Sequence, residues 1–238
     1  MNYLFTFLLL CTSFNINAQE LSGKELLDKA IKAHDPHNNW PSFIGSLQIT
    51  MTTPKSPKRV SNVDINLPAQ RFELIAVRDS ILTEYRVNKK EISVVKEDWK
   101  NPEKQLGTTE MDLEQAVFMK NYYTYLYGLP MKLKDQGTHI AEKVERKSFK
   151  GKEYLVLKVT YDQHVGSDAW FFYFDPTTYQ MEVYQFFKTD PSGKIIPKTG
   201  EYILLSENHM VNGINMPKVR KWYYNKDGQF LGADVISK

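Results

Sequence analysis

The chain of 238 residues has almost no cysteine: Cys11 is the only one, and it lies in an apolar segment at the N-terminus. The rest of the chain therefore cannot form a disulfide and must be stabilised by burial of apolar side chains. A chain of this length buries most of the surface that its unfolded form exposes, so we expect a stable core without covalent cross-links. A cysteine nucleophile is excluded from the folded part.

A strong excess of charge of one sign is also missing. The 31 basic and 28 acidic residues give a formal net charge of +3. Such a balance does not favour nucleic acid, and the local cluster Lys55, Lys58 and Arg59 is typical of a solvated turn. We therefore predict no nucleic-acid partner.

Only one long apolar run is present, and it is too short for a bilayer span. Leu4 to Phe14 carries no charge and is followed by polar residues and Ala18, whereas spanning a membrane takes roughly 20 apolar residues. A short apolar run before a small residue is typical of a secretory signal peptide. We predict that residues 1–18 are a signal peptide cleaved after Ala18. The mature protein is then periplasmic or secreted.

The mature chain, residues 19–238, contains no linker, repeat or low-complexity tract, so we predict one domain and a monomer with no membrane span. Lipid anchoring is not expected either. A lipoprotein signal needs a small residue before the modified cysteine, and Leu10 stands before Cys11.

Two segments have helical patterns. Ser22 and Glu25 form the capping box of a helix that runs to about residue 34. A second helix is predicted from about 110 to 127, with Gly128 after its end. This second helix carries aromatic or apolar side chains on nearly all sides, which predicts burial all round or insertion into a groove.

The rest of the chain alternates apolar and polar residues over short segments bounded by turn residues, which is typical of β-strands. No helical pattern separates consecutive strands, so an antiparallel meander is favoured over parallel βαβ units. A sheet this large rarely stays flat. We predict an α+β fold: a strongly curved, open half-barrel of about eleven antiparallel strands with two helices covering its concave face. The expected strands are 43–52, 59–67, 71–78, 81–88, 91–97, 139–149, 153–162, 168–175, 179–188, 200–208, 214–224 and 229–236.

The segment 168–187 is the richest in aromatic residues, and it is predicted to form two strands joined by an Asp175-Pro176 turn. Side chains alternate across a strand, so aromatic residues occupy both of its faces. We predict that one of these faces and the second helix line a pocket for a hydrophobic ligand; the alternative is that the same residues fill a core. The predicted ligand-binding residues are Trp170, Phe172, Phe174, Tyr184, Phe186, Tyr122 and Tyr125.

Two clusters of titratable residues have the composition of chemical sites. His34, Asp35 and His37 have the types of metal ligands, but they coincide with a helix end and a turn, which favours a structural role. His164 lies close in sequence to Asp162 and Asp168, as a general base with a carboxylate partner would, yet turns attract the same residues. No nucleophile motif accompanies them. We predict no catalytic residue, no metal and no cofactor.

The order of elements resembles that of the bacterial outer-membrane lipoprotein carrier and lipoprotein-sorting proteins. The capped helix 22–34 and the strand-turn-strand 170–183 carry this resemblance, since a similar Asp-Pro-x-Thr turn joins two strands in those carriers. The resemblance implies an open half-barrel whose mouth is covered by helices. The whole mature chain is more closely similar to an uncharacterised family of secreted Gram-negative proteins, in the stretches 23–31, 120–131, 216–219 and 222–225.

Three functions remain open from these observations. The first is a non-enzymatic periplasmic protein that holds an acyl chain, a lipid or a lipidated protein in the half-barrel. The second is an envelope protein–protein interaction module with a filled core. The third is a hydrolase that uses His164.

Overall fold

The computed structural model describes residues 21–237. The predicted signal peptide, residues 1–18, lies outside the described residues together with its cleavage position. The helices are α1 (Gly23–His34), α2 (Glu110–Tyr127), and the short 3-10 helices η1 (Trp40–Ser42) and η2 (Met131–Lys134). The strands are β1 (Ile44–Thr53), β2 (Ser56–Asn66), β3 (Arg71–Arg78), β4 (Ile81–Asn88), β5 (Glu91–Asp98), β6 (Thr138–Ile140), β7 (Glu145–Phe149), β8 (Lys152–Tyr161), β9 (Ala169–Phe174), β10 (Met181–Phe187), β11 (Glu201–Val211), β12 (Ile214–Tyr224) and β13 (Phe230–Ile236).

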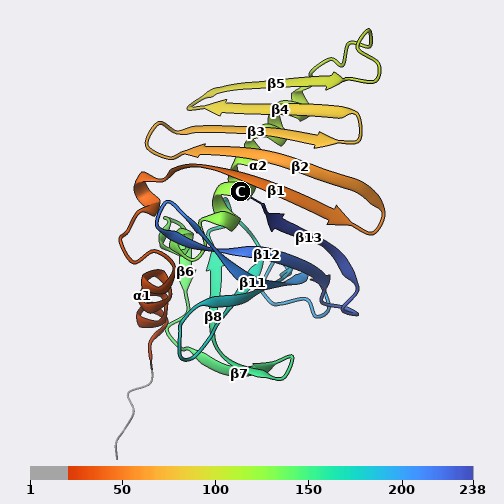
Figure 1. Cartoon of the computed structure of the whole chain (residues 1–238). Helices are drawn as coiled ribbons and strands as arrows, with labels where there is room; N and C mark the ends of the chain where they lie inside the picture. Colours follow the sequence, from red (N-terminus) through yellow and green to blue (C-terminus); the bar gives the residue numbers. More distant parts are fainter. Residues whose placement is uncertain (1–20, 238) are drawn as a thin grey trace, which may run out of the picture.

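The strands form one antiparallel sheet that is not closed into a barrel (Figure 1). Its order is β5-β4-β3-β2-β1-β13-β12-β11-β10-β9-β8-β6, and β7 also pairs with β8. The first and last strands of the chain are therefore neighbours in the middle of the sheet, where β1 pairs with β13. This arrangement confirms the predicted α+β fold with a large open antiparallel sheet and two helices.

The strand count is thirteen rather than about eleven, and one predicted strand proves to be two. The segment 139–149 divides into β6 and β7, which pair with opposite ends of β8. Between them the chain turns toward the start of α1, where the carbonyl of Glu142 accepts from the N–H of Gly23 (2.7 Å) and Ser22 bridges to Lys143. These contacts with α1 interrupt the ladder.

Both helices begin at the caps expected from the sequence. The Ser22 hydroxyl accepts from the N–H of Glu25, whose carboxylate accepts from the N–H of Ser22. Thr109 and Asp112 form the same reciprocal pair at the start of α2. Each cap satisfies backbone donors that a helix start leaves without partners.

Helix α2 lies diagonally behind β1–β5 (Figure 1) and contacts β3, β4 and β5, whereas α1 contacts β8 and β12. The expectation that α2 is buried all round is wrong for its first half, where Met111 and Phe118 are exposed. The alternative, insertion into a groove, describes it better, because Tyr123 and Tyr127 in its second half are buried. Within residues 21–237, no helix has the length and apolar composition that crossing a membrane requires.

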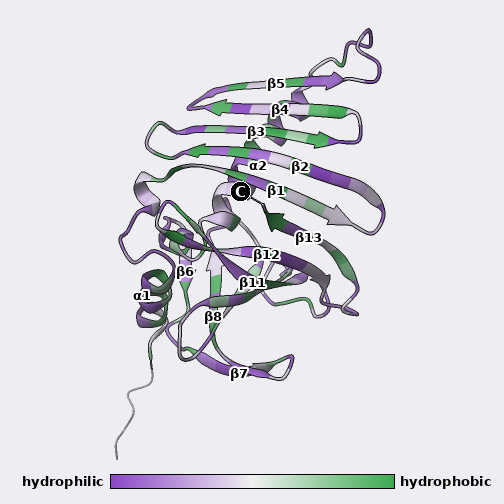
Figure 2. Ribbon diagram, viewed as in Figure 1, coloured by the Kyte–Doolittle hydropathy of each residue, from purple (hydrophilic) through white to green (hydrophobic). Residues whose placement is uncertain are grey.

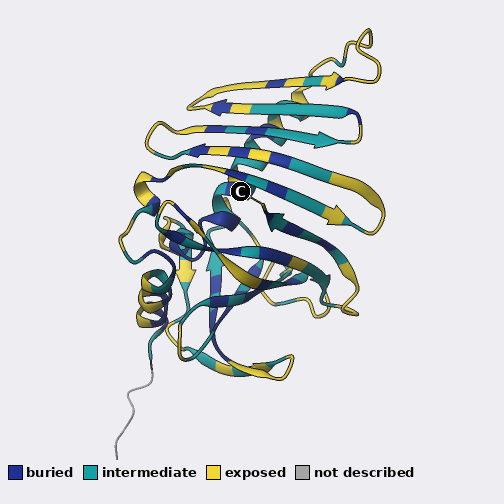
Figure 3. Ribbon diagram, viewed as in Figure 1, coloured by how far each residue is buried: buried dark blue, intermediate teal, exposed yellow. Residues whose placement is uncertain are grey.

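Along the strands, burial alternates as the pleat requires. In β2, Ser61, Val63 and Ile65 are buried while Asn62 and Asp64 between them are exposed. Figure 2 and Figure 3 show this alternation of hydropathy and burial along the first strands of the sheet. One face of this part of the sheet therefore contacts water, and the other forms the core together with α2.

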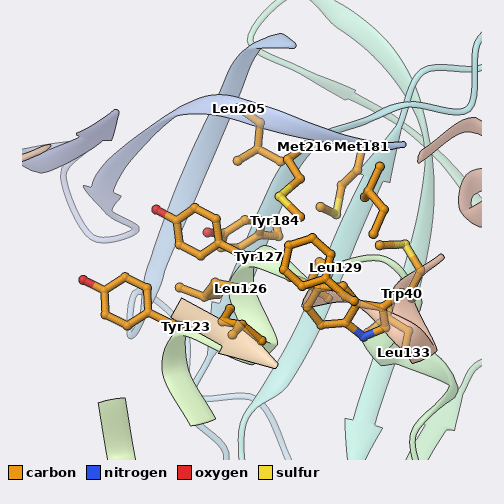
Figure 4. Close-up of a cluster of buried hydrophobic side chains, with 14 of the residues drawn as sticks. Trp40, Tyr123, Leu126, Tyr127, Leu129, Leu133, Met181, Tyr184, Leu205 and Met216 are labelled. Atoms are coloured by element: carbon orange, nitrogen blue, oxygen red, sulfur yellow. The ribbon is translucent and has the colours of Figure 1, made fainter. Parts of the chain in front are cut away.

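The centre of the core lies at the end of α2. Figure 4 shows Tyr123, Leu126 and Tyr127 of α2 packed beside Tyr184 of β10, with the hydroxyl groups of the three tyrosines directed to the same side of the cluster. Apolar side chains from both ends of the sequence complete the cluster. Because these groups come from distant segments, this end of α2 holds the two halves of the sheet together.

Candidate functional site

The side chains of His34 and Asp35 are hydrogen-bonded to backbone groups. The N–H of Met181 donates to Nε2 of His34 (2.9 Å), so Nδ1 carries the proton and donates to the carbonyl of Asn215 (2.8 Å). Burial lowers the pKa of His34, which therefore stays neutral. The carboxylate of Asp35 accepts from the N–H groups of Asn39 and Trp40, both at 2.8 Å. The imidazole of His34 thus joins α1 to β10 and β12. The carboxylate of Asp35 stabilises the turn after α1.

The aromatic hairpin is fixed by its Asp-Pro turn. Oδ1 of Asp175 accepts from the N–H groups of Thr177 (2.9 Å) and Thr178 (2.8 Å), and Oδ2 lies 2.8 Å from Nζ of Lys152. The Lys152 ammonium and these donors hold the pKa of Asp175 well below its usual range. Beyond the turn, a bulge between Met181 and Val183 shifts the register, and Tyr184 of β10 then lies opposite Phe172 of β9.

Three of the seven predicted ligand-binding residues lie in the packed core. Phe172, Phe174 and Tyr184 are each 0% exposed. Phe186 is half-buried and stacks on Trp170 with ring centroids 4.9 Å apart. A ligand on the surface cannot reach the first three side chains, and a binding role for them stays a prediction that requires the core to open.

Trp170 and Tyr125 line a cleft of about 520 Å³, which we call cleft A. It lies between α2, the η2–β6 segment and the loop that joins β8 to β9. Trp170 and Tyr125 meet edge to face at 5.9 Å, and the Tyr125 hydroxyl is hydrogen-bonded to that of Tyr161. The apolar rim is completed by two exposed side chains, Phe118 (57% exposed) and Val165 (50% exposed). Cleft A thus has an aromatic wall with two apolar side chains at its entrance, while most of its remaining lining is polar.

The polar side of cleft A contains the residues weighed for hydrolysis. His164 is exposed on its rim and Asp168 is half-buried, with its pKa raised by burial. Asp162 pairs with His139 instead, whose Nε2 lies 2.6 Å from Oδ1 of Asp162. In the described part of the chain His164 has no hydrogen bond to either carboxylate. Its segment is a turn closed by the N–H groups of Val165 and Gly166 on the carbonyl of Asp162.

Tyr122 lies at a second cleft, of about 280 Å³, which we call cleft B. Its walls are formed by Tyr122 of α2, Met51 of β1 and Trp222 of β12, and its polar groups are the carboxylates of Glu201 and Asp234. The rings of Tyr122 and Trp222 are nearly parallel, 18° apart, with centroids separated by 6.3 Å. The structure therefore divides the predicted aromatic pocket into two clefts on either side of a filled core.

A row of charged residues beneath α2 was missed by the sequence reasoning. Strand register aligns Arg59 of β2, Met51, Asp234 of β13 and Arg220 of β12 across four neighbouring strands. Arg220 is 1% exposed; Nη1 donates to the carbonyl of Pro217 (2.8 Å), and the guanidinium lies 3.9 Å from the centre of the Tyr127 ring. Such a row is visible only once the register is known.

Arg59 corrects the expectation of a solvated basic turn. Lys55 and Lys58 are exposed at the β1–β2 hairpin, as expected, but Arg59 is half-buried. Its Nη2 donates to the hydroxyl of Tyr123 on α2 (2.9 Å). Because side chains alternate along β2, Lys58 and Arg59 lie on opposite faces, and only Arg59 contacts the helix.

Metal ligands do not gather in this part of the molecule. Within residues 21–237, no three side chains of His, Cys, Asp or Glu are grouped closely enough to hold a metal ion. What the two clefts offer is aromatic surface combined with a few charged groups.

Comparison with known proteins gives a family but no function. No curated protein sequence matches the chain. Among solved structures, the chain is similar to a LolA superfamily protein, NE2245 from Nitrosomonas europaea (12% identity, 91% of this chain and 92% of that chain covered, TM-score 0.49). It is also similar to a DUF1329 family protein from Desulfovibrio piger ATCC 29098 (7% identity, 91% of each chain, TM-score 0.48) and to MucB in its complex with MucA(peri) (8% identity, 90% and 92%, TM-score 0.27). Similarity at this level carries no information on ligand or activity. The model of a family of unknown function, DUF6503, matches residues 2–237, and the chain therefore belongs to that family.

Proposed function

We propose that the protein is a non-enzymatic, exported binding protein that holds the apolar part of a hydrophobic ligand, an acyl chain or lipid, in cleft A. The observation that carries this proposal is the exposed apolar rim of the cleft. Phe118 and Val165 are among the most exposed large apolar side chains of the described residues, and both stand at the entrance of a concavity whose wall is Trp170 and Tyr125. Exposed apolar groups that converge on a concave surface are typical of a binding site.

The size of cleft A supports a ligand of moderate length. Its volume of about 520 Å³ lies within the range of roughly 300–1,000 Å³ that small-molecule sites occupy. Each methylene transferred from water contributes about 0.8 kcal/mol, which corresponds to nearly a fourfold change in affinity. Affinity for a series of fatty acids should therefore rise about three- to fourfold per added methylene until the cleft is full.

Export rests on the predicted signal peptide. The apolar run Leu4 to Phe14 and the small residue Ala18 support secretion to the periplasm or beyond. Expression of the full chain, followed by fractionation and N-terminal sequencing, tests this part: a mature protein starting at Gln19 outside the cytoplasm is the expected product.

The experiment on the ligand uses protein purified gently from the periplasm and analysed by native mass spectrometry, followed by titration of the delipidated protein with fatty acids of increasing length. We expect a co-purified lipid and a saturable change in tryptophan fluorescence, because Trp170 lines the cleft. Recovery without lipid, together with unchanged fluorescence at every chain length, would rule the proposal out.

A matched pair of variants ties binding to cleft A. Phe118→Ser removes a rim side chain that is 57% exposed, and Met111→Ser removes one in the same helix that is 78% exposed and outside the cleft. Phe118 also stacks on Tyr122, with ring centroids 6.0 Å apart, so the free energy of unfolding of both variants is measured beside their affinity. We expect Phe118→Ser to weaken fatty-acid binding about fivefold, in line with loss of part of an aromatic contact, while Met111→Ser leaves it unchanged. Equal affinities in the two variants would place the ligand elsewhere.

A second candidate, an envelope protein–protein interaction module, is favoured by the filled core. Phe172, Phe174 and Tyr184 are fully buried, and the terminal strand β5 carries exposed Ile92 and Val95. Exposed apolar residues on an edge strand are suited to pairing with another chain. This candidate predicts lipid-free protein in the mass spectrum and affinity for a protein partner that Ile92→Lys abolishes.

A further inference from the structure

Cleft B is distinguished by two carboxylates that no basic side chain neutralises at contact distance. Asp234 is 3% exposed, Glu201 is half-buried, and both line the cleft. Within residues 21–237 neither carboxylate has an ion-pair or side-chain hydrogen-bond partner; the charges of Arg59 and Arg220 act on Asp234 only at longer range. A carboxylate this buried without a contact partner is costly, which marks Asp234 as a candidate for binding a positively charged group.

The two arginines near Asp234 make their hydrogen bonds to groups outside cleft B, and Nε of each is buried without a hydrogen-bond partner among the described residues. Arg220 donates to backbone carbonyls of Pro217 and Leu126 and lies over the Tyr127 ring. Arg59 donates to the Tyr123 hydroxyl. Neither guanidinium lines the cleft. The side chains that line cleft B therefore present negative charge to a ligand. The positive charges of the two arginines reduce this negative potential near Asp234.

A β-bulge interrupts the pairing of β13 with β12 beside Trp222. Trp222 lies opposite Gly232, and the register then shifts so that Tyr223 lies opposite Phe230, which leaves Leu231 as the extra residue of a β-bulge. Gly232 allows a close approach of β1, because a Cβ at this position would lie 2.6 Å from the carbonyl oxygen of Thr52. Bulges are frequent beside functional sites, where they redirect side chains and interrupt pairing.

Aromatic faces combined with carboxylates are the chemistry that recognises organic cations, because ring faces carry negative electrostatic potential and the substituents of an ammonium group are apolar. A hard metal ion would need six or more oxygen ligands, which two carboxylates do not supply. An anion would be repelled. We propose that cleft B binds an organic ammonium group, with its charge between Glu201 and Asp234 and its carbon substituents against Tyr122 and Trp222.

The electrostatics of the two carboxyls give this proposal a second consequence. Burial raises the pKa of Glu201 and of Asp234, while Arg59 and Arg220 oppose the rise at Asp234. A bound cation stabilises the ionised carboxylates, so binding should release protons when it occurs near the pKa of these groups. Affinity should accordingly increase with pH through that range and then level off.

The direct test is NMR titration of the folded protein with hexyltrimethylammonium, observed at the indole N–H of Trp222. Trp222→Phe assigns that resonance among the four tryptophans of the chain. We expect a saturable shift at the Trp222 resonance with hexyltrimethylammonium, and little or none with hexanol or hexanoate at the same concentrations. An equal shift with hexanol would show that cleft B is merely an apolar surface and would overturn the proposal.

Variants of the carboxylates separate charge recognition from packing. Glu201→Gln keeps the size of a half-buried side chain, and we expect it to weaken binding of the ammonium probe about fivefold, as loss of one partly screened charge does. Asp234→Asn should weaken it further, and because Asp234 is buried, Glu201→Gln remains decisive if that variant is unstable. The matched control is Asp168→Asn, a half-buried carboxyl in cleft A. Unchanged affinity in Glu201→Gln would refute the proposal.

An ammonium group can belong to a free amine or to a lipid headgroup, and vesicles distinguish the two sources. Co-sedimentation with phosphatidylcholine vesicles that Glu201→Gln weakens to the same extent as binding of the soluble probe would identify a headgroup as the ligand. Binding of the soluble probe without such co-sedimentation would identify a free amine. Binding of fatty acids in cleft A is assigned by the Phe118→Ser and Met111→Ser pair, whereas binding in cleft B is assigned by the Trp222 resonance, so failure of one proposal does not imply failure of the other.

Discussion

The two faces of strand β9 carry similar aromatic residues but have different surroundings. On the inner face, Phe172 and Phe174 are 0% exposed and belong to the main core beneath α2. On the outer face, Phe171 is 8% exposed and Tyr173 is 5% exposed, and they belong to a separate, smaller cluster. One strand thus contributes to two hydrophobic clusters at once.

What covers each face explains this difference. Helix α2 and side chains from both halves of the sheet close the inner face, so its contacts join segments far apart in the sequence. The outer face is covered locally, by Phe149 of the β7–β8 hairpin and by the ammonium of Lys147, which lies 5.0 Å from the centre of the Phe171 ring. A local cover can adjust when a side chain is lost, whereas the inner cluster is fixed from several directions. The buried fraction of an aromatic side chain alone therefore does not determine how much the side chain contributes to the free energy of unfolding.

The largest expected effect is the difference between Phe172→Ala and Phe171→Ala. Truncation of a fully buried Phe costs about 3–5 kcal/mol of unfolding free energy, and the cost depends on how far the site can collapse. We expect Phe172→Ala to reach this range and Phe171→Ala to cost less by at least about 1 kcal/mol. Urea denaturation of both variants, with unchanged slopes, measures the two values. Equal losses would show that the outer cluster is as rigid as the inner one.

The elements of the sheet could be predicted because their signals are local. The capping boxes at Ser22 and Thr109, the Asp175 turn and the alternation along β3 and β4 each depend on residues within a few positions of one another. The local pattern predicts a single strand over 139–149, because the contacts that interrupt it come from the start of α1, more than a hundred residues earlier.

The two clefts could not be predicted, because they depend on which strands become neighbours. The row of Arg59, Asp234 and Arg220 requires β1 to pair with β13, which no local pattern encodes. The periodicity placed Trp170, Phe172 and Phe174 on one face, and it did so correctly. The position of α2 then determined that Phe172 and Phe174 are covered while Trp170 reaches the wall of cleft A.

An intermediate effect on the free energy of unfolding is expected at His34, which joins α1 to Met181 and Asn215. The pKa of His34 is lowered by burial, whereas in the unfolded chain it lies near 6.5. Below that value the unfolded state binds a proton that the folded state does not, so stability should be complete above pH 6.5 and fall by about 1.4 kcal/mol per pH unit beneath it until the folded pKa is reached. Denaturation at pH 7.5, 6.5 and 5.5 measures this slope.

The matched variants for this effect are His34→Gln and His37→Gln, since His37 is an exposed histidine three residues further along. We expect His34→Gln to be less stable at pH 7.5, through loss of hydrogen bonds to buried backbone groups, and to show a flatter dependence on pH. His37→Gln should keep both the stability and the slope of the natural sequence. A slope that is the same in all three proteins would mean that other groups determine the acid response.

The smallest expected effect concerns Lys147, one of the residues that cover the outer face of β9. Lys147→Met keeps the aliphatic part of the side chain and removes the charge over Phe171, together with an ion pair to Glu145 at 2.8 Å that is exposed to solvent. Cation–π contacts and exposed ion pairs each contribute only about 0.2–1 kcal/mol, so the change in unfolding free energy should stay below about 1 kcal/mol. A double-mutant cycle with Phe171→Leu isolates the contact between the ammonium and the ring from the ion pair. If the coupling energy approached the loss in Phe172→Ala, the outer face would have to be regarded as a second structural core, because a purely local cover cannot supply an interaction of that size.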